Sequence, residues 1–355
     1  MTKDTENRLR VVQVGLGTWG RDWARLVVPE VVEVELVGCV DSDPLALATL
    51  QELSSISPEQ CFASLNDALE ATKPQAVLVT TTLPTHAPLT QAALKAGMHV
   101  LVEKPFADTL ECAQELVDLA AAKALTLMVS QNYRCFPASR TAARLVKEAP
   151  LGRLHQISID FRQNDAAPPN RRRRHHFEAQ PLLVDMSIHH FDLLRLVVGR
   201  EPESIYCNAW NPDWSGYDGP CVAIASLDFG GDVMVSYRGS WISAGPSTPW
   251  AGEWRMDFEQ GEIFWTSRGE DNVLNDRVIL RPRGGSPRPM SLPGMSRIDR
   301  AGTLTEFASA VRGSREAETS GRDNLGTIAM VAAAVESATR REPVQVRRFR
   351  QQSAV

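Results

Sequence analysis

The chain has 355 residues, of which 43% are hydrophobic and 23% charged, and its formal net charge is −5. This length fits about two domains of about 100–200 residues each, and the composition excludes wholesale disorder. The acidic balance argues against a protein that coats nucleic acid, because phosphate binding needs a basic surface. The polar start, Met1–Arg10, lacks the apolar core of a signal peptide. The longest uncharged stretch, residues 74–94, contains three prolines and is not expected to span a membrane.

The cysteines indicate a reducing compartment. All six are scattered singly, with no C-x-x-C pair and no metal-type spacing. Isolated cysteines in a chain of this length behave as small apolar residues. We therefore expect a cytoplasmic protein.

The first third of the sequence alternates apolar runs with helical patterns. Near-continuous apolar strands separated by helices are typical of a parallel sheet covered on both faces, as in a doubly wound Rossmann domain. The expected strands are residues 9–14, 34–40, 76–81, 99–102 and 125–129.

Beyond about residue 150, strands follow one another with short turns, which predicts an α+β domain with a mainly antiparallel, open sheet. A helix over 182–198 interrupts the strands, helices over 303–312 and 324–340 close the chain, and Arg281–Gly294 is expected to be a surface loop. We divide the chain into a dinucleotide-binding domain, residues 1–131, and a substrate-binding and oligomerisation domain, residues 132–355. The expected strands of the second domain are 154–162, 204–210, 222–228, 232–241, 253–258 and 262–265.

A glycine motif directly follows the first strand. Residues 15–20 read G-x-G-x-x-G, with Gly15, Gly17 and Gly20 as the glycines and Thr18 and Trp19 between them. In such a motif the first glycine permits a tight turn, the second lets the backbone approach a pyrophosphate, and the third lets helix and strand pack closely. Asp41 ends the next strand, where a carboxylate accepts hydrogen bonds from ribose hydroxyls. Residues 42–50 contain no Lys or Arg to neutralise a 2′-phosphate, so NAD is favoured over NADP.

Three further motifs complete a recognisable pattern. Thr80–His86 follows a strand, Glu103-Lys104-Pro105 follows the next one, and Asp185-x-x-x-His189 lies in the helix expected in the second domain. In this order behind a Rossmann motif, they resemble the glucose–fructose oxidoreductase, inositol dehydrogenase and rhizopine catabolism (Gfo/Idh/MocA) family over essentially the whole chain. The resemblance implies an NAD-dependent enzyme that transfers a hydride between the secondary hydroxyl of a sugar, inositol or glycoside and the nicotinamide.

The resemblance also implies roles for the catalytic residues. Lys104 would hold the reacting hydroxyl, His189 would act as general base in oxidation, and Asp185 would orient it or hold a neighbouring hydroxyl. Elementary chemistry agrees, because a histidine titrates near working pH. Positions i and i+4 of a helix also share a face, so Asp185 and His189 are expected to point the same way.

Further contacts follow from the resemblance. Those with the cofactor would come from the glycine motif and from Asp41, Ser42, Thr81, Thr82, His86, Glu103, Lys104 and Asn132. Those with the substrate would come from Lys104, Tyr133, Arg134, Arg162, Asn164, Asp185, His189 and His190.

Two features allow two interpretations each. His190 either contacts substrate or packs in the core. The run Arg171–Arg174 is either a solvated charge run or a cationic rim for an acidic substrate. No metal is expected, since adjacent histidines on a helix point about 100° apart and rarely share one ion.

Two other functions fit the same motifs. One is a reductase acting on a keto sugar, and the other is a sensor or regulator that binds the dinucleotide without catalysis, against which an intact Lys–Asp–His set argues. The expected partners are a small sugar or polyol and further copies of the chain, as a dimer or tetramer formed through the second sheet. No nucleic acid or membrane partner is expected. The sequence identifies neither the sugar nor the carbon oxidised.

Overall fold

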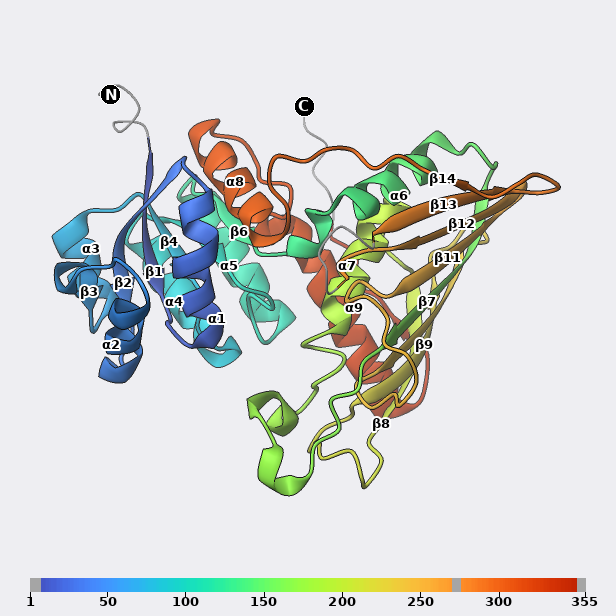
Figure 1. The fold of residues 1–355 in the computed structure, drawn as a ribbon, viewed down its shortest axis with the longest axis horizontal. Coiled ribbons are helices and arrows are strands. Elements are labelled where there is room, and N and C mark those ends of the chain that lie inside the picture. The colour runs from blue at the N-terminus through green and yellow to red at the C-terminus, as the bar shows by residue number, and fades with distance from the viewer. Residues whose placement is uncertain (1–7, 270–275, 350–355) are drawn as a thin grey trace. The chain divides into compact units, whose positions relative to one another are not determined.

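The computed structural model describes residues 8–269 and 276–349 (Figure 1). Residues 1–7, most of the polar start examined for a signal peptide, lie outside this part. The chain forms two compact units: residues 1–132 with 297–325, and residues 133–296 with 326–355. The junction after Asn132 lies one residue from the boundary expected after residue 131, but residues 297–325 belong to the first unit rather than to the second.

The first unit contains a six-stranded sheet in the order β3-β2-β1-β4-β5-β6, and every strand pair in it is parallel. The strands expected from the apolar runs are present, and the short β3 was not foreseen. The doubly wound Rossmann fold is therefore confirmed. The strands are β1 (Leu9–Val14), β2 (Val34–Val40), β3 (Cys61–Phe62), β4 (Ala76–Val79), β5 (His99–Val102) and β6 (Leu127–Val129). The helices are α1 (Thr18–Asp22), α2 (Pro44–Leu53), α3 (Leu65–Thr72), α4 (Leu83–Lys95), α5 (Leu110–Ala122) and α8 (Asp299–Arg312).

Helix α8 explains the division of the chain. Its residues Leu304 and Phe307 are buried in one cluster with Val11, Leu78 and Leu101 of the parallel sheet. An apolar helix face in contact with this sheet removes both surfaces from water. The segment after the second sheet therefore returns to the first unit, a long-range contact that local sequence pattern does not encode.

The second unit contains a nine-stranded sheet in the order β14-β13-β12-β11-β7-β10-β9-β8-β15. All its pairs are antiparallel except β7 with β10, so the expected open and mainly antiparallel sheet is confirmed. The strands are β7 (Leu154–Arg162), β8 (Ser204–Trp210), β9 (Val222–Asp228), β10 (Met234–Ser240), β11 (Glu253–Phe258), β12 (Gly261–Thr266), β13 (Arg277–Pro282), β14 (Arg288–Pro289) and β15 (Val344–Gln345).

Helices α6 (Pro137–Glu148), α7 (Ser187–Val198) and α9 (Gly321–Arg340) lie along one face of this sheet (Figure 1). Inward-facing side chains of alternating positions, such as Ile157, Ile159 and Phe161 on β7, are buried. Strand β14 pairs with β13 through Ile279 and Leu280. The segment 281–294, which was expected to be a loop, therefore contains the short strand β14. Proline is tolerated there because β14 is the edge strand of the sheet, where a backbone without an N–H group breaks no strand pairing.

Candidate active site

The glycine motif is shaped by close packing. Gly15 has φ +98°, and a Cβ atom there would lie 2.6 Å from Cγ2 of Thr81. A Cβ on Gly20 would lie 2.0 Å from the carbonyl oxygen of Gly15. At Gly17, by contrast, nothing lies within 4 Å of the Cβ position. The first and third glycines are thus required by the protein itself, whereas the second leaves open space for a group such as a pyrophosphate, so the residues present fit a dinucleotide.

The carboxylate of Asp41 is fixed beside this loop. Its Oδ2 accepts a hydrogen bond from the Leu16 amide at 2.7 Å, and its Oδ1 accepts one from the Asp43 amide at 2.9 Å. Ser42 follows it and is exposed. Charge-assisted bonds to the backbone hold the anion in place at the end of β2, where the sequence predicted a ribose contact.

The loop after β4 supports the glycine motif. Thr81 packs on Gly15, Thr82 precedes α4, and His86 is buried within α4. His86 contacts two carbonyl oxygens, Nδ1 that of Pro105 at 2.6 Å and Nε2 that of Thr81 at 3.2 Å. Burial lowers the pKa of His86, although both carbonyl contacts act in the opposite direction. His86 therefore links the loop after β4 to the loop after β5.

Glu103 ties the glycine-motif helix to the expected catalytic lysine. One carboxylate oxygen, Oε1, accepts hydrogen bonds from the indole N–H groups of Trp19 at 2.9 Å and Trp23 at 2.7 Å. The other, Oε2, accepts from the Lys104 amide at 3.3 Å. Glu103 is buried, and such a carboxylate needs these donors to offset its lost hydration. Sequence reasoning listed Glu103 as a cofactor contact and overlooked Trp23. For Glu103, the sequence signal of a structural role was a charged residue directly after the apolar strand 99–102.

Gln13 was also overlooked. This side chain is the next to last of β1 and is fully buried. Its amide donates to the Gly20 carbonyl at 2.7 Å and to Thr80 Oγ1 at 3.0 Å, so it fixes the glycine turn from inside the core. A glutamine inside the apolar run LRVVQV was a signal for such a role.

Asn132, expected to contact the cofactor, is buried at the end of the first unit. Its amide donates to Oδ1 of Asp299, the first residue of α8. Asn132 therefore attaches the returning helix to the loop after β6.

In the second unit, α7 begins at Ser187, so Asp185 lies in the preceding turn rather than inside the helix. This corrects the expected helix start at residue 182 and the one-helix basis for pairing Asp185 with His189. The turn mixes hydrogen-bond types: the Leu182 carbonyl accepts from the Met186 amide at 3.0 Å and from the Ser187 amide at 2.7 Å, and the second of these is one residue longer than an α-helical bond.

The ring of His189 stacks on the ring of Tyr133. The centroids are 4.0 Å apart and the planes differ by 3°. His189 is in the first turn of α7 and Tyr133 in the short helix Asn132–Arg134, so the contact joins two distant parts of this unit. Two residues expected at the substrate thus lie together.

His190 points into the core instead. It has no exposed surface; Nδ1 contacts the Tyr237 hydroxyl at 3.1 Å and Nε2 the Trp250 carbonyl at 3.0 Å. A carbonyl only accepts, so Nε2 carries the hydrogen and Nδ1 accepts from Tyr237. Burial lowers the pKa of His190 to about 4, which keeps the ring neutral. Of the two interpretations of His190, this arrangement favours packing.

Arg134 is likewise engaged inside the protein. Its guanidinium forms a bidentate pair with Asp192 of α7 at 2.6 and 2.7 Å, and both side chains are buried. Thr327 of α9 also donates to Asp192. The pair joins three helical segments, which gives Arg134 a structural role, and its contact with substrate stays a prediction.

Arg162 and Asn164 lie at the end of β7. The guanidinium of Arg162 pairs with Asp160 and, at 3.2 Å, with Glu253 of the neighbouring strand. Asn164 is exposed and forms an isolated backbone bridge with Ile242. These contacts hold Arg162 at the sheet, while Asn164 keeps an accessible side chain.

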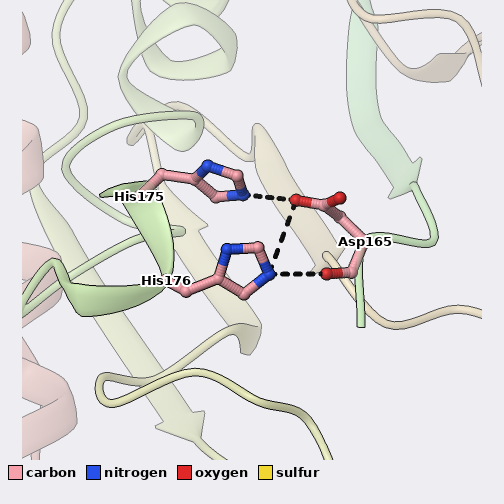
Figure 2. Close-up of side chains that lie close together, drawn as sticks. All are labelled: Asp165, His175 and His176. Atoms are coloured by element: carbon pink, nitrogen blue, oxygen red, sulfur yellow. Dashed lines mark hydrogen bonds and ion pairs between the residues drawn. The ribbon is translucent and has the colours of Figure 1, made fainter. Parts of the chain in front are cut away.

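A cluster of metal-binding residue types lies in the loop after β7: Asp165, His175 and His176 (Figure 2). The backbone amide of Arg173 donates to Nδ1 of His176, so His176 Nε2 carries its hydrogen and donates to the Asp165 carbonyl at 2.9 Å. The Asp165 carboxylate already pairs with Arg173 and His175 and accepts from the Tyr217 hydroxyl. These contacts account for the grouping of the three side chains by hydrogen bonds and ion pairs within the protein.

The arginine run is mostly paired. Arg172 contacts Asp218, Arg173 contacts Asp165, and Arg174 lies 3.8 Å from Glu178. Three of its four charges thus have carboxylate partners within the same unit. Arg171, Arg173 and Arg174 are nevertheless exposed, which agrees with the interpretation of a solvated charge run.

Three features define a dinucleotide-binding fold of the kind found in oxidoreductases: the parallel sheet, the open space beside Gly17 and the fixed carboxylate of Asp41. Residues 9–131 match the GFO/IDH/MocA oxidoreductase family with its NAD-binding Rossmann fold, and residues 139–264 match the GFO/IDH/MocA C-terminal domain. The chain belongs to this family, so its first unit is an NAD-binding domain.

Relatives match over nearly the whole chain. An uncharacterized protein of Sinorhizobium fredii, y4oX, is 28% identical, and the match covers 96% of this chain and 97% of the relative's length. Inositol 2-dehydrogenase of Rhizobium meliloti is 24% identical, and the match covers 94% of this chain and 98% of that enzyme's length. The crystal structure of an inositol dehydrogenase homologue from Azotobacter vinelandii with NADH and myo-inositol superposes with a TM-score of 0.81 at 19% identity, covering 97% and 99%. Among the residues described, no helix is long and apolar enough to cross a bilayer.

Replacing Asp41 with Ala tests the cofactor contact. Loss of charge-assisted bonds to the ribose hydroxyls is expected to raise KM for NAD roughly ten- to a hundredfold. The same change should reduce discrimination against NADP, as measured by kcat/KM with each cofactor. Asp43→Ala, which removes the neighbouring carboxylate that caps α2, is the matched control. Equal turnover of both cofactors by the wild type would contradict the NAD preference.

Replacing Arg134 with Met tests its structural role. The change leaves the buried Asp192 carboxylate without its guanidinium, which is expected to lower the free energy of unfolding by about 3–5 kcal/mol. Arg144→Met breaks a pair on α6 whose side chains are 49% and 51% exposed, and should cost only ~0.3–0.5 kcal/mol. Urea unfolding of the two variants distinguishes them, and equal losses would show that the Arg134 pair is no stronger than a surface pair.

Proposed function

We propose that this protein is an NAD-dependent dehydrogenase of a secondary hydroxyl in a sugar, inositol or glycoside, with Lys104 and His189 as its acid–base residues. The observation that carries the proposal is the presence of the E-K-P and D-x-x-x-H motifs in the two domains that match the family. Names of relatives support the substrate class, since one is an inositol 2-dehydrogenase and another binds NADH and myo-inositol.

Bound NAD supplies nicotinamide C4 as the hydride acceptor. Gly15, Gly17 and Gly20 would hold its pyrophosphate, and Asp41 its adenosine ribose. The residues of the chain then manage the proton. Oxidation of a carbinol removes a hydride from carbon and a proton from oxygen, and the His189 imidazole accepts the proton. The Lys104 ammonium holds the hydroxyl oxygen, and Asp185 orients the imidazole or a neighbouring hydroxyl. In reduction, His189 returns the proton.

Lys104→Ala and His189→Ala test these roles. Each is expected to lower kcat by about 10²–10⁴-fold, because general acid–base catalysis contributes about that factor. Binding of NADH, followed by energy transfer from tryptophan, should persist. Lys95→Ala and His155→Ala change exposed residues of the same types and serve as controls. The assay is NAD reduction across a panel of neutral and acidic sugars, inositols and glycosides. Absence of hydride transfer across the panel would favour a sensor, and full turnover by both variants would refute the assignment.

The uncovered face of the second sheet supports self-association. Positions that alternate with the buried ones carry Tyr206, Trp210, Ile224 and Met234, each between 39% and 46% exposed. The paired register places them on one face of β8, β9 and β10. Exposed apolar side chains gathered on one face favour association.

Ile224→Glu tests this interface. A carboxylate in the middle of this face, which an interface would remove from water, is expected to convert the oligomer to a 39.1 kDa monomer in light scattering coupled to size exclusion. Leu45→Glu, at an exposed position of α2, should leave the mass unchanged. A monomeric wild type would overturn the proposal.

A further inference from the structure

The imidazole of His189 is part of a three-residue stack. Its ring lies parallel to that of Tyr133 at 4.0 Å. The guanidinium of Arg268 donates through Nη1 to the Tyr133 hydroxyl at 3.0 Å, and its Cζ lies 4.7 Å from the centre of the same ring. Tyr133 is therefore held through its hydroxyl and its ring by one cation, and it contacts the proposed base with that ring.

Arg268 is itself held firmly. It follows β12 and has φ +58°, a left-handed conformation that costs free energy for any residue with a Cβ. Its carbonyl accepts from the Trp250 amide at 3.0 Å, and its backbone amide donates to the Asp276 carboxylate. The guanidinium also lies 5.9 Å from the centre of the Trp250 ring. A strained backbone that its surroundings over-determine is typical of a functional position.

The stack meets a requirement of proton transfer. An imidazole that takes a proton from an alcohol must present one nitrogen along the O–H direction, and small errors in orientation reduce the rate strongly. Parallel contact with a fixed ring limits rotation of the His189 ring about its Cβ–Cγ bond. The Arg268 hydrogen bond anchors the buried Tyr133 ring at its far end, the hydroxyl.

We propose that Arg268 is a positioning residue that acts through Tyr133 to fix the imidazole plane of His189. This inference rests on the proposed function of His189. Arg268 suits the task better than lysine, because a planar guanidinium lies flat against a ring while it donates a directed hydrogen bond. The sequence showed no sign of this role, since Arg268 is far from every motif.

The kinetic test is a double-mutant cycle of Arg268→Met and Tyr133→Phe. Tyr133→Phe keeps the ring and removes the hydroxyl that accepts from Arg268. Each single change is expected to lower kcat roughly tenfold with little change in KM for substrate or NAD, since misplacement of a catalytic group by about 1 Å costs up to about 10²-fold. Because both changes break the same link, the double variant should be no slower than the slower single variant. Arg268→Lys should recover part of the loss.

Arg255→Met is the matched control. Arg255 also lies over an aromatic ring of the nine-stranded sheet, with its Cζ 5.3 Å from the centre of the Phe264 ring. It should keep full kcat. Thermal unfolding midpoints show whether each variant is folded, and Arg268→Lys serves if Arg268→Met is not. Full kcat in Arg268→Met, or multiplied losses in the double variant, would overturn the inference. An inactive wild type would instead overturn the proposed function.

Proton NMR of the histidine rings provides a readout independent of turnover. Stacking on Tyr133 should shift the ring protons of His189, assigned from the signal lost in His189→Gln, away from the positions of exposed histidines. In Arg268→Met and Tyr133→Phe these shifts should diminish, and in Arg255→Met they should remain. Unchanged His189 signals in both variants would show that Arg268 does not fix the ring.

Discussion

The buried carboxylate of Glu103 is the interaction on which the first half of the site depends. It receives two indole N–H groups from the helix that follows the glycine motif and the backbone amide of Lys104 from the loop after β5. A carboxylate removed from water is costly unless several donors surround it. The same donors fix where the helix and the lysine lie relative to each other. The dinucleotide loop and the backbone of Lys104, the proposed catalytic lysine, are therefore positioned by one group.

Local pattern predicted much of the fold. The apolar runs at 9–14, 34–40 and 99–102 have the bounds of β1, β2 and β5, because a strand buried on both faces leaves a continuous apolar signature. The α8 segment is different. Its apolar face fits any sheet, and only the tertiary structure shows that Leu304 and Phe307 pack on the first unit. The start of α7 was misplaced for a similar reason, since Asp185 fits a helical period but lies in a turn.

The site shows the same limit at the level of side chains. His189 and His190 are neighbours with equal chemistry in the sequence, yet one stacks on Tyr133 and the other donates to a carbonyl in the core. Adjacent helix positions point about 100° apart, so the two buried rings meet different surroundings. The motif selects His189, whereas the burial of His190 depends on Tyr237 and Trp250, which come from a distant strand and loop. The pairing of Arg134 with Asp192 likewise depends on a residue that the motifs did not indicate.

The proposed acid–base pair is divided between two units of the chain, with Lys104 in one and His189 in the other. Each unit prepares its own half with internal contacts. Glu103 holds the backbone of Lys104, and Tyr133 holds the ring of His189. Both contacts restrict their partners without a ligand, which reduces the ordering that ligand binding would require in each unit. On the proposed function, Trp23 and Arg268 support motif residues from within each unit, Trp23 by donating to Glu103 and Arg268 by donating to Tyr133, the residue that stacks on His189.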